Sequence, residues 1–296
     1  MTELSLLRVL LLLSMAVAPL GTHRFFFAEP SRLRTAVHAG ALVCAAIGLF
    51  LPAPMLCVAW LFFCVASFGQ FLRHRAASLR SLPVLAACVP FLFSIIAATW
   101  LVGGANDLRI LGYGPQFSYY AALHGNVLGW IMIGALAALA NQDGPYRSVY
   151  LASVFACFAS FLLIALGIDQ LRMLKPIGVV VLSVAIPASQ LAFLRSVWSR
   201  NKAAFALGCI SFSGLVFTML LAWRNELSMA AFPAVLQLRG MVSVHGVLNA
   251  VVVGPSFLLA VALEARRRAN SETSSVGVGF GAAAAHHRRS IRTPGS

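Results

Sequence analysis

Three histidines lie inside long apolar segments and are the residues of this sequence best suited to chemistry: His38, His124 and His245. An ionisable side chain at membrane depth costs free energy, so it marks a functional candidate. No aspartate, glutamate, lysine or arginine lies in the middle of any apolar segment. Proton transfer within the membrane would therefore rest on imidazole rather than on paired carboxylates.

His124 and His245 stand in similar surroundings. Each is followed by glycine. Each lies about seven residues, or roughly 10 Å, inside an apolar segment that enters from the same side of the membrane. Tyr120 precedes His124 by four residues and Asn249 follows His245 by four, so each shares a helix face with its histidine. We predict one candidate pocket, formed by His124, His245, Asn249 and Tyr120.

Small residues accompany both histidines and predict close helix packing. Gly125 and Gly129 form a G-x-x-x-G pair on the first helix, and Gly246, Ala250 and Gly254 form a longer ridge on the second. Such ridges let helix backbones approach closely, and close packing is a main source of helix association in membranes. We expect these five residues to lie against neighbouring helices.

Several chemistries fit this pair of imidazoles. The first is a pocket that binds or transports a small apolar or amphipathic molecule. The second is a membrane enzyme, or a carrier of b-type haem, because imidazole is a standard haem ligand. The third is structural, with each ring bonded to an adjacent helix. Zinc takes three or four ligands, and no carboxylate or cysteine is close by, so no metal site is predicted.

The sequence carries no catalytic signature of the soluble type. It has no G-x-S-x-G, no Walker lysine motif, no H-E-x-x-H and no dinucleotide fingerprint. Its six cysteines lie in apolar runs, and no C-x-x-C occurs. Whether the protein is an enzyme stays open at this stage.

The elements that must position these residues are nine apolar segments, at about 4–20, 35–51, 54–72, 82–102, 117–140, 148–168, 176–194, 203–223 and 240–263. Of 296 residues, 60% are hydrophobic and 10% are charged, which excludes an ordinary soluble domain. We predict an all-α, polytopic membrane helix bundle of about nine transmembrane helices. It should cover residues 1–265, with 266–296 as a disordered basic cytoplasmic tail rich in Ser, Gly, Ala and Arg.

The basic residues predict the orientation of the bundle. Of the 22 lysines and arginines, sixteen follow helices 1, 3, 5, 7 and 9 and six lie on the other side. Positive loops face the cytoplasm, so we expect the N-terminus outside and the C-terminus inside an inner (plasma) membrane. The sequence Ala16-Val17-Ala18 resembles a cleavage site, but cleavage would place three arginines outside, so we expect the first helix to be retained.

The net charge of +14 is explained by basic residues in the loops between apolar segments. Basic loops set topology and face anionic headgroups, so the lipid bilayer is the expected partner. No recognised nucleic-acid-binding motif accompanies the charge, and no nucleic-acid partner is predicted.

The string from Met241 to Ala250 resembles a motif of the YndJ-like family of bacterial membrane proteins, which runs roughly M-V-R-x-H-G-x-x-N-A. The matching positions are Met241, Val242, His245, Gly246, Asn249 and Ala250. The resemblance implies a multi-pass, transporter-like membrane protein and marks the two histidine helices as a pair. The family also has an earlier H-F-H-type motif, where this sequence reads Ala122-Leu123-His124, so the first of its histidines is missing.

Overall fold

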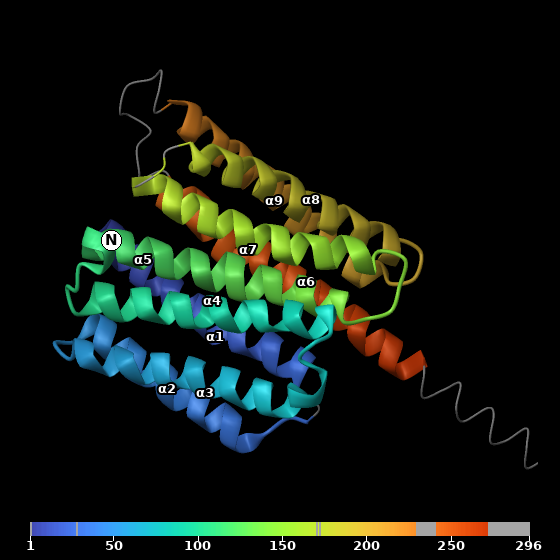
Figure 1. Ribbon diagram of the computed structural model, residues 1–296, viewed down its shortest axis with the longest axis horizontal. Coiled ribbons are helices and arrows are strands. Elements are labelled where there is room, and N and C mark those ends of the chain that lie inside the picture. Colours follow the sequence, from blue (N-terminus) through green and yellow to red (C-terminus); the bar gives the residue numbers. More distant parts are fainter. Residues whose placement is uncertain (1, 28, 170, 172, 229–240, 272–296) are drawn as a thin grey trace, which may run out of the picture.

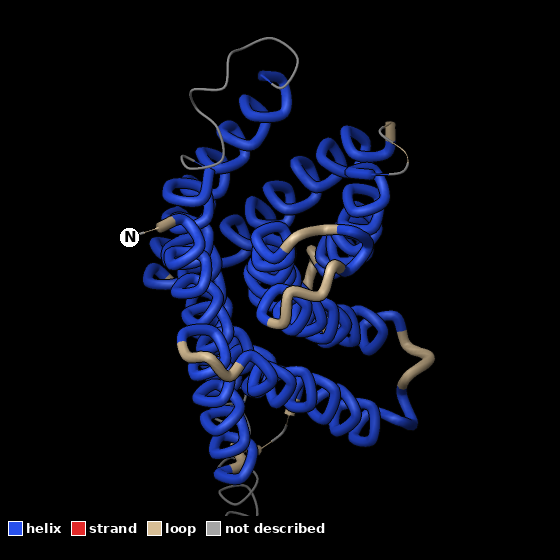
Figure 2. The backbone as a smooth tube through the Cα atoms, turned by 90° about the vertical axis from the view of Figure 1, so that its left-hand side faces the viewer, coloured by secondary structure: helices blue, strands red, loops and turns tan. Residues whose placement is uncertain are grey.

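The computed structural model describes residues 2–27, 29–169, 171, 173–228 and 241–271. Within these ranges the chain forms helices and no strands (Figures 1 and 2). Nine helices of this part of the chain are long and apolar enough to cross a membrane. The predicted all-α membrane bundle is therefore confirmed.

The helices follow one another with short connections. Their bounds are α1 (Glu3–Phe26), α2 (Arg32–Phe50), α3 (Val58–Arg75), α4 (Leu82–Ala105), α5 (Pro115–His124), α6 (Ile133–Ala140), α7 (Arg147–Asp169), α8 (Leu174–Val197) and α9 (Lys202–Ser228). A π-helix, η4 (Gly125–Met132), joins α5 to α6 in one continuous span. The described part of the C-terminal helix contains two π-helices, η6 (Met241–Gly246) and η7 (Leu248–Val253), and continues to Ser271.

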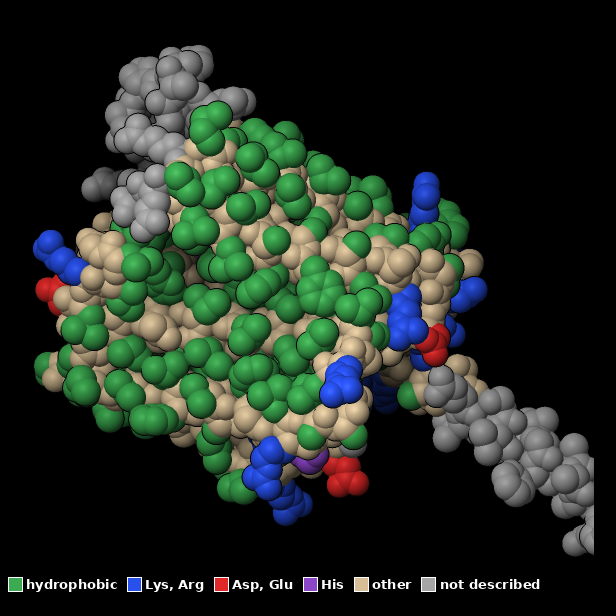
Figure 3. All heavy atoms as spheres, in the orientation of Figure 1, with side chains coloured by type: hydrophobic (Ala, Val, Ile, Leu, Met, Phe, Trp, Pro, Cys, Tyr) green, Lys and Arg blue, Asp and Glu red, His purple; other side chains and the backbone are tan. Residues whose placement is uncertain are grey.

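The span made by α5, η4 and α6 is the centre of the bundle. Within its most apolar window 89% of the residues are buried, against 28% for the equivalent windows of α2, α7 and α9. It contacts α1, α4 and α7, and every residue of α6 is buried. The outer helices instead present apolar side chains over the visible surface, with charged residues toward the helix ends (Figure 3). This distribution is typical of a bundle surrounded by lipid.

The glycines of η4 bring the central span close to α4. A Cβ at Gly125 would lie 2.8 Å from the Cβ of Ala97, and one at Gly129 would lie 2.2 Å from the ring of Phe93. Gly254 lies in the same way near Ile131 of η4. These three positions therefore pack against neighbouring helices. Ala250 is buried, and Gly246 ends η6 in a half-buried position.

A proline in α1 is matched by a histidine in α2. Pro19 lacks an N–H group, which leaves the carbonyl of Met15, four residues earlier, without its helical partner. His38 Nε2 lies 3.1 Å from this carbonyl oxygen and hydrogen-bonds to it. Membrane helices tolerate proline where a neighbouring group supplies the missing donor, and His38 is that donor here.

The last helix carries a buried carboxylate close to its end. Glu264 is 1% exposed and accepts hydrogen bonds from Arg267 at 2.8 and 2.9 Å and from Arg268 at 3.0 Å. Asn201, before α9, adds a bond of 3.3 Å. The helix extends six residues into the predicted tail, and 272–296 lie outside the described residues.

Candidate functional site

The structure brings His124 and His245 together. Their ring centroids are 6.2 Å apart and the ring planes differ by 30°. His124 is the last residue of α5, and His245 is the fifth residue of η6. His124 is exposed on the surface of the bundle, whereas His245 is partly buried behind it. The two rings thus form a site, here called the imidazole pair, that is open on one side.

Backbone carbonyls place a proton on Nδ1 of both rings. His124 Nδ1 lies 2.9 Å from the carbonyl oxygen of Tyr120, and His245 Nδ1 lies 3.0 Å from that of Thr218 in α9. A carbonyl oxygen only accepts hydrogen bonds, so each Nδ1 carries a proton, and in the neutral form of each ring Nε2 is the acceptor. Within the described part of the chain, neither Nε2 makes a hydrogen bond. The imidazole pair therefore offers two nitrogen lone pairs.

Asn249 is linked to His245 through Thr218 of α9. Its side-chain oxygen lies 3.1 Å from the hydroxyl of Thr218, the residue whose carbonyl holds His245 Nδ1. The Thr218 hydroxyl also lies 3.0 Å from the carbonyl of Leu215. Asn249 thereby ties the C-terminal helix to α9 at the level of the imidazole pair. Sequence reasoning placed Asn249 near His245 but did not identify Thr218, because nothing in the pattern of α9 marks it.

Tyr120 reaches His124 through its backbone only. Its hydroxyl donates to the carboxylate of Glu3 in α1, which also accepts a bond of 2.8 Å from Gln116. The phenol is thus engaged at the end of the bundle and is not directed into the imidazole pair. Of the four residues predicted to form a pocket, His124 and His245 meet through their rings. Asn249 contacts Thr218, which binds His245, and Tyr120 binds His124 through its backbone carbonyl.

Both histidines border π-helical segments. His124 directly precedes η4, and His245 lies in η6 with η7 following. π-helical turns are rare and are frequent at functional sites, because the extra residue per turn re-aims side chains and frees backbone groups. Apolar periodicity does not distinguish this winding from an α-helix, so the sequence pattern does not predict it.

The family model for YndJ-like protein matches residues 8–253. The chain belongs to the YndJ-like family. The match includes His124, His245 and Asn249, so the imidazole pair lies within the family region. No curated protein and no solved structure gives a significant match.

This YndJ-like protein has a second pair of histidines in its interior. The rings of His23 and His38 are 6.4 Å apart and nearly perpendicular. His38 stacks on Phe63 at 5.3 Å and touches Trp60 at 5.8 Å. The first apolar segment was predicted to end at about residue 20, but α1 continues to Phe26, and its last turns carry His23 into the bundle. His74, which follows the predicted segment 54–72, lies in the last turn of α3.

Metal ligands are sparse in the part of the YndJ-like chain that the structure describes. It contains no group of three or more His, Cys, Asp or Glu side chains arranged to hold a metal ion. A ligand of the imidazole pair would therefore be held by the two imidazole nitrogens and by packing against the neighbouring side chains.

Proposed function

We propose that this YndJ-like protein is an integral membrane protein that binds a small apolar or amphipathic molecule where the helix of His124 meets that of His245. Transport of that molecule is the activity we assign to it. The observation that carries the proposal is the pair of carbonyl-bound Nδ1 atoms, which directs ligand contact to the Nε2 atoms of two rings whose centroids are 6.2 Å apart.

The surroundings of the imidazole pair favour a ligand with an apolar body and a polar head. The exposed large side chains of the bundle include many aliphatic residues, as expected beside lipid, so a ligand could enter sideways from the bilayer. The two lone pairs accept hydrogen bonds, which selects a head that donates, such as a hydroxyl, phenol or amine. A purely apolar molecule would leave both acceptors without a partner.

Two matched probes test this proposal: 4-octylphenol, which carries a donor, and octylbenzene, which lacks one. We expect 4-octylphenol to raise the thermal unfolding midpoint of the purified protein and octylbenzene to leave it unchanged. His124→Phe and His245→Phe should abolish the difference, and His74→Phe, in α3, should retain it. Equal responses to both probes in every variant would contradict the proposal.

A second candidate function follows from the same distance. Two imidazoles close together could hold a b-type haem, because imidazole is a standard haem ligand. The protein would then be a haem carrier or a membrane enzyme in which His124 and His245, with ring centroids 6.2 Å apart, hold the haem. A Soret band in the protein purified from haem-supplied cells, lost in His245→Phe, would favour this alternative, and its absence would exclude haem.

The proposed location is an inner (plasma) membrane with the N-terminus outside. The support is the distribution of the 22 basic residues, sixteen of which follow alternate helices. A cytoplasmic reporter fused after Ser296 should be active and a periplasmic one inactive. The reverse pattern would place the imidazole pair in the cytoplasmic leaflet instead of the outer one.

A further inference from the structure

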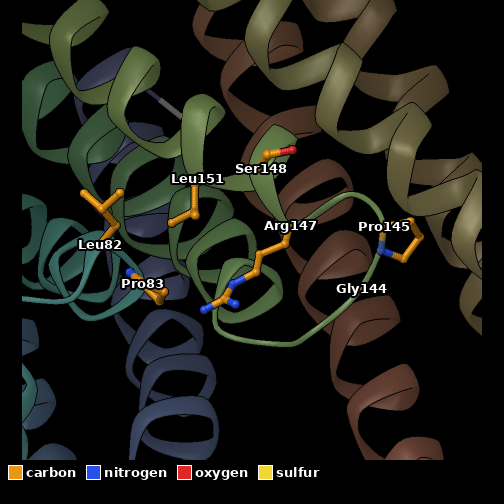
Figure 4. Close-up of a pocket in the computed structure, with 7 residues that line it drawn as sticks. All are labelled: Leu82, Pro83, Gly144, Pro145, Arg147, Ser148 and Leu151. Carbon is orange, nitrogen blue, oxygen red and sulfur yellow. The ribbon is translucent and has the colours of Figure 1, made fainter.

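A shallow groove of about 540 Å³ lies at the opposite end of the bundle from the imidazole pair. It is lined by residues from the start of α4, from the turn before α7 and from the start of α7: Leu82, Pro83, Gly144, Pro145, Arg147, Ser148 and Leu151 (Figure 4). We propose that this groove binds the headgroup of one anionic phospholipid, with the phosphate on Arg147.

The charge of the groove fits a phosphate. Arg147 reaches toward Pro83 across the groove (Figure 4). Its Nε donates to the carbonyl of Ala140 at 3.3 Å, and one terminal nitrogen binds Asp143 at 3.0 Å. The guanidinium is thereby held in place while 41% of the side chain stays exposed, so it can meet a ligand without first being ordered. Arginine suits phosphate oxygens because its donors form a planar fork.

The backbone around the groove holds Arg147 in place. α4 and α7 both begin there, and the backbone N–H of Arg147 donates to the carbonyl of Gly144 at 3.2 Å. Pro83, in the first turn of α4, has no N–H. The positive charge of the groove therefore comes from the Arg147 guanidinium. The side-chain amide of Asn141, at the end of α6, donates to the Pro83 carbonyl at 2.8 Å and so links the end of α6 to the start of α4.

The apolar side of the groove identifies a lipid rather than a free ion. Leu82 is 60% exposed, and Leu151 lies one turn along α7 from Arg147. Both leucines stand where spans end, at the depth of the boundary between headgroups and acyl chains. A free phosphate would leave these leucines uncovered, whereas the first carbons of a lipid would cover them. Basic grooves between helix ends are the sites where membrane proteins retain anionic lipids.

The test compares the full-length protein in nanodiscs of phosphatidylglycerol and of phosphatidylcholine, and in detergent with inorganic phosphate. We expect phosphatidylglycerol to raise the unfolding midpoint and to stay bound in native mass spectrometry, about fivefold more than phosphatidylcholine. Inorganic phosphate should have no effect. Arg147→Gln should bring the ratio of bound phosphatidylglycerol to bound phosphatidylcholine close to one, whatever it does to the stability of the protein without lipid.

Two matched variants keep this test decisive. Asp143→Asn removes the carboxylate beside Arg147 and leaves the guanidinium, so it should preserve or increase the preference for phosphatidylglycerol. Arg200→Gln removes an equal charge away from the lining residues and should not change it. The same preference in Arg147→Gln as in the unmodified protein would overturn the proposal, and so would stabilisation by inorganic phosphate alone.

Discussion

The two histidine pairs of this protein have nearly the same spacing and opposite environments. The rings of His124 and His245 are 6.2 Å apart, and those of His23 and His38 are 6.4 Å apart. In the first pair each Nδ1 binds a carbonyl and one ring is exposed. In the second pair the rings lie among Phe63, Trp60 and other aromatic side chains.

The difference between the two pairs shows that two histidines can lie close together without being free to bind a ligand. His38 completes the hydrogen bonding of α1 at a carbonyl that Pro19 leaves free, so its donor is already committed to the fold. His124 bonds to a carbonyl of its own helix, which needs no outside donor. The interior pair is therefore expected to stabilise the bundle, and the imidazole pair to be free for a ligand. Two substitutions, at His38 and His124, test this contrast, and a third, at Gly129, sets the scale by disrupting the packing of the central span.

The largest effect is expected at Gly129, which holds the central span against α4. Leucine there would place its Cβ 2.2 Å from the ring of Phe93, so either the ring or the whole span must shift. Gly129→Leu should destabilise the protein by about 3 kcal/mol, at the upper end of the range for overpacking. Thermal or denaturant unfolding in detergent measures it. Gly69→Leu is the control, because a Cβ there meets nothing within 4 Å.

An intermediate effect is expected at His38. His38→Ala leaves the Met15 carbonyl buried without a donor, which should cost about 1–3 kcal/mol of unfolding free energy. In a Pro19→Ala background residue 19 regains its N–H and can satisfy Met15 itself, so the same substitution should cost less. Equal losses in the two backgrounds would show that His38 stabilises the bundle through ring packing alone.

The smallest effect is expected at His124. Because its ring is exposed and its bond lies within one helix, His124→Ala should change the unfolding free energy by no more than about 0.5 kcal/mol. The same unfolding measurement as for His38 applies. A loss as large as that of His38→Ala would erase the contrast between the pairs and return His124 to a structural role.

The sequence predicts much of this arrangement because membrane helices leave a strong apolar signal. The nine spans follow from segment length, and the approach of His124 to His245 follows from their equal depth and entry side. Thr218 could not be found, since a single threonine in an apolar helix has many structural explanations. The end of the first helix was predicted too early, at about residue 20, because the apolar run stops there, yet α1 continues to Phe26 and includes His23.

Hydrogen bonds between two different helices were the hardest feature to predict from the sequence. Pro19 alone indicates a free carbonyl at Met15, but it does not indicate which neighbour supplies the donor. The hydroxyl of Tyr120 shares a helix face with His124, as expected, and is nevertheless directed to Glu3 of another helix. The π-helical winding beside both histidines leaves no periodicity that a sequence pattern separates from an α-helix.

The carboxylate of Glu264 has a consequence for biosynthesis. Arg267 and Arg268 follow it by three and four residues, so all three groups meet as soon as this turn of helix forms. The negative charge is therefore compensated within its own helix, whether or not Asn201, from the connection between α8 and α9, has joined it. Burying an unpaired carboxylate would be costly, and this pairing avoids it. The final helix can dock late in assembly without carrying an uncompensated charge into the interior.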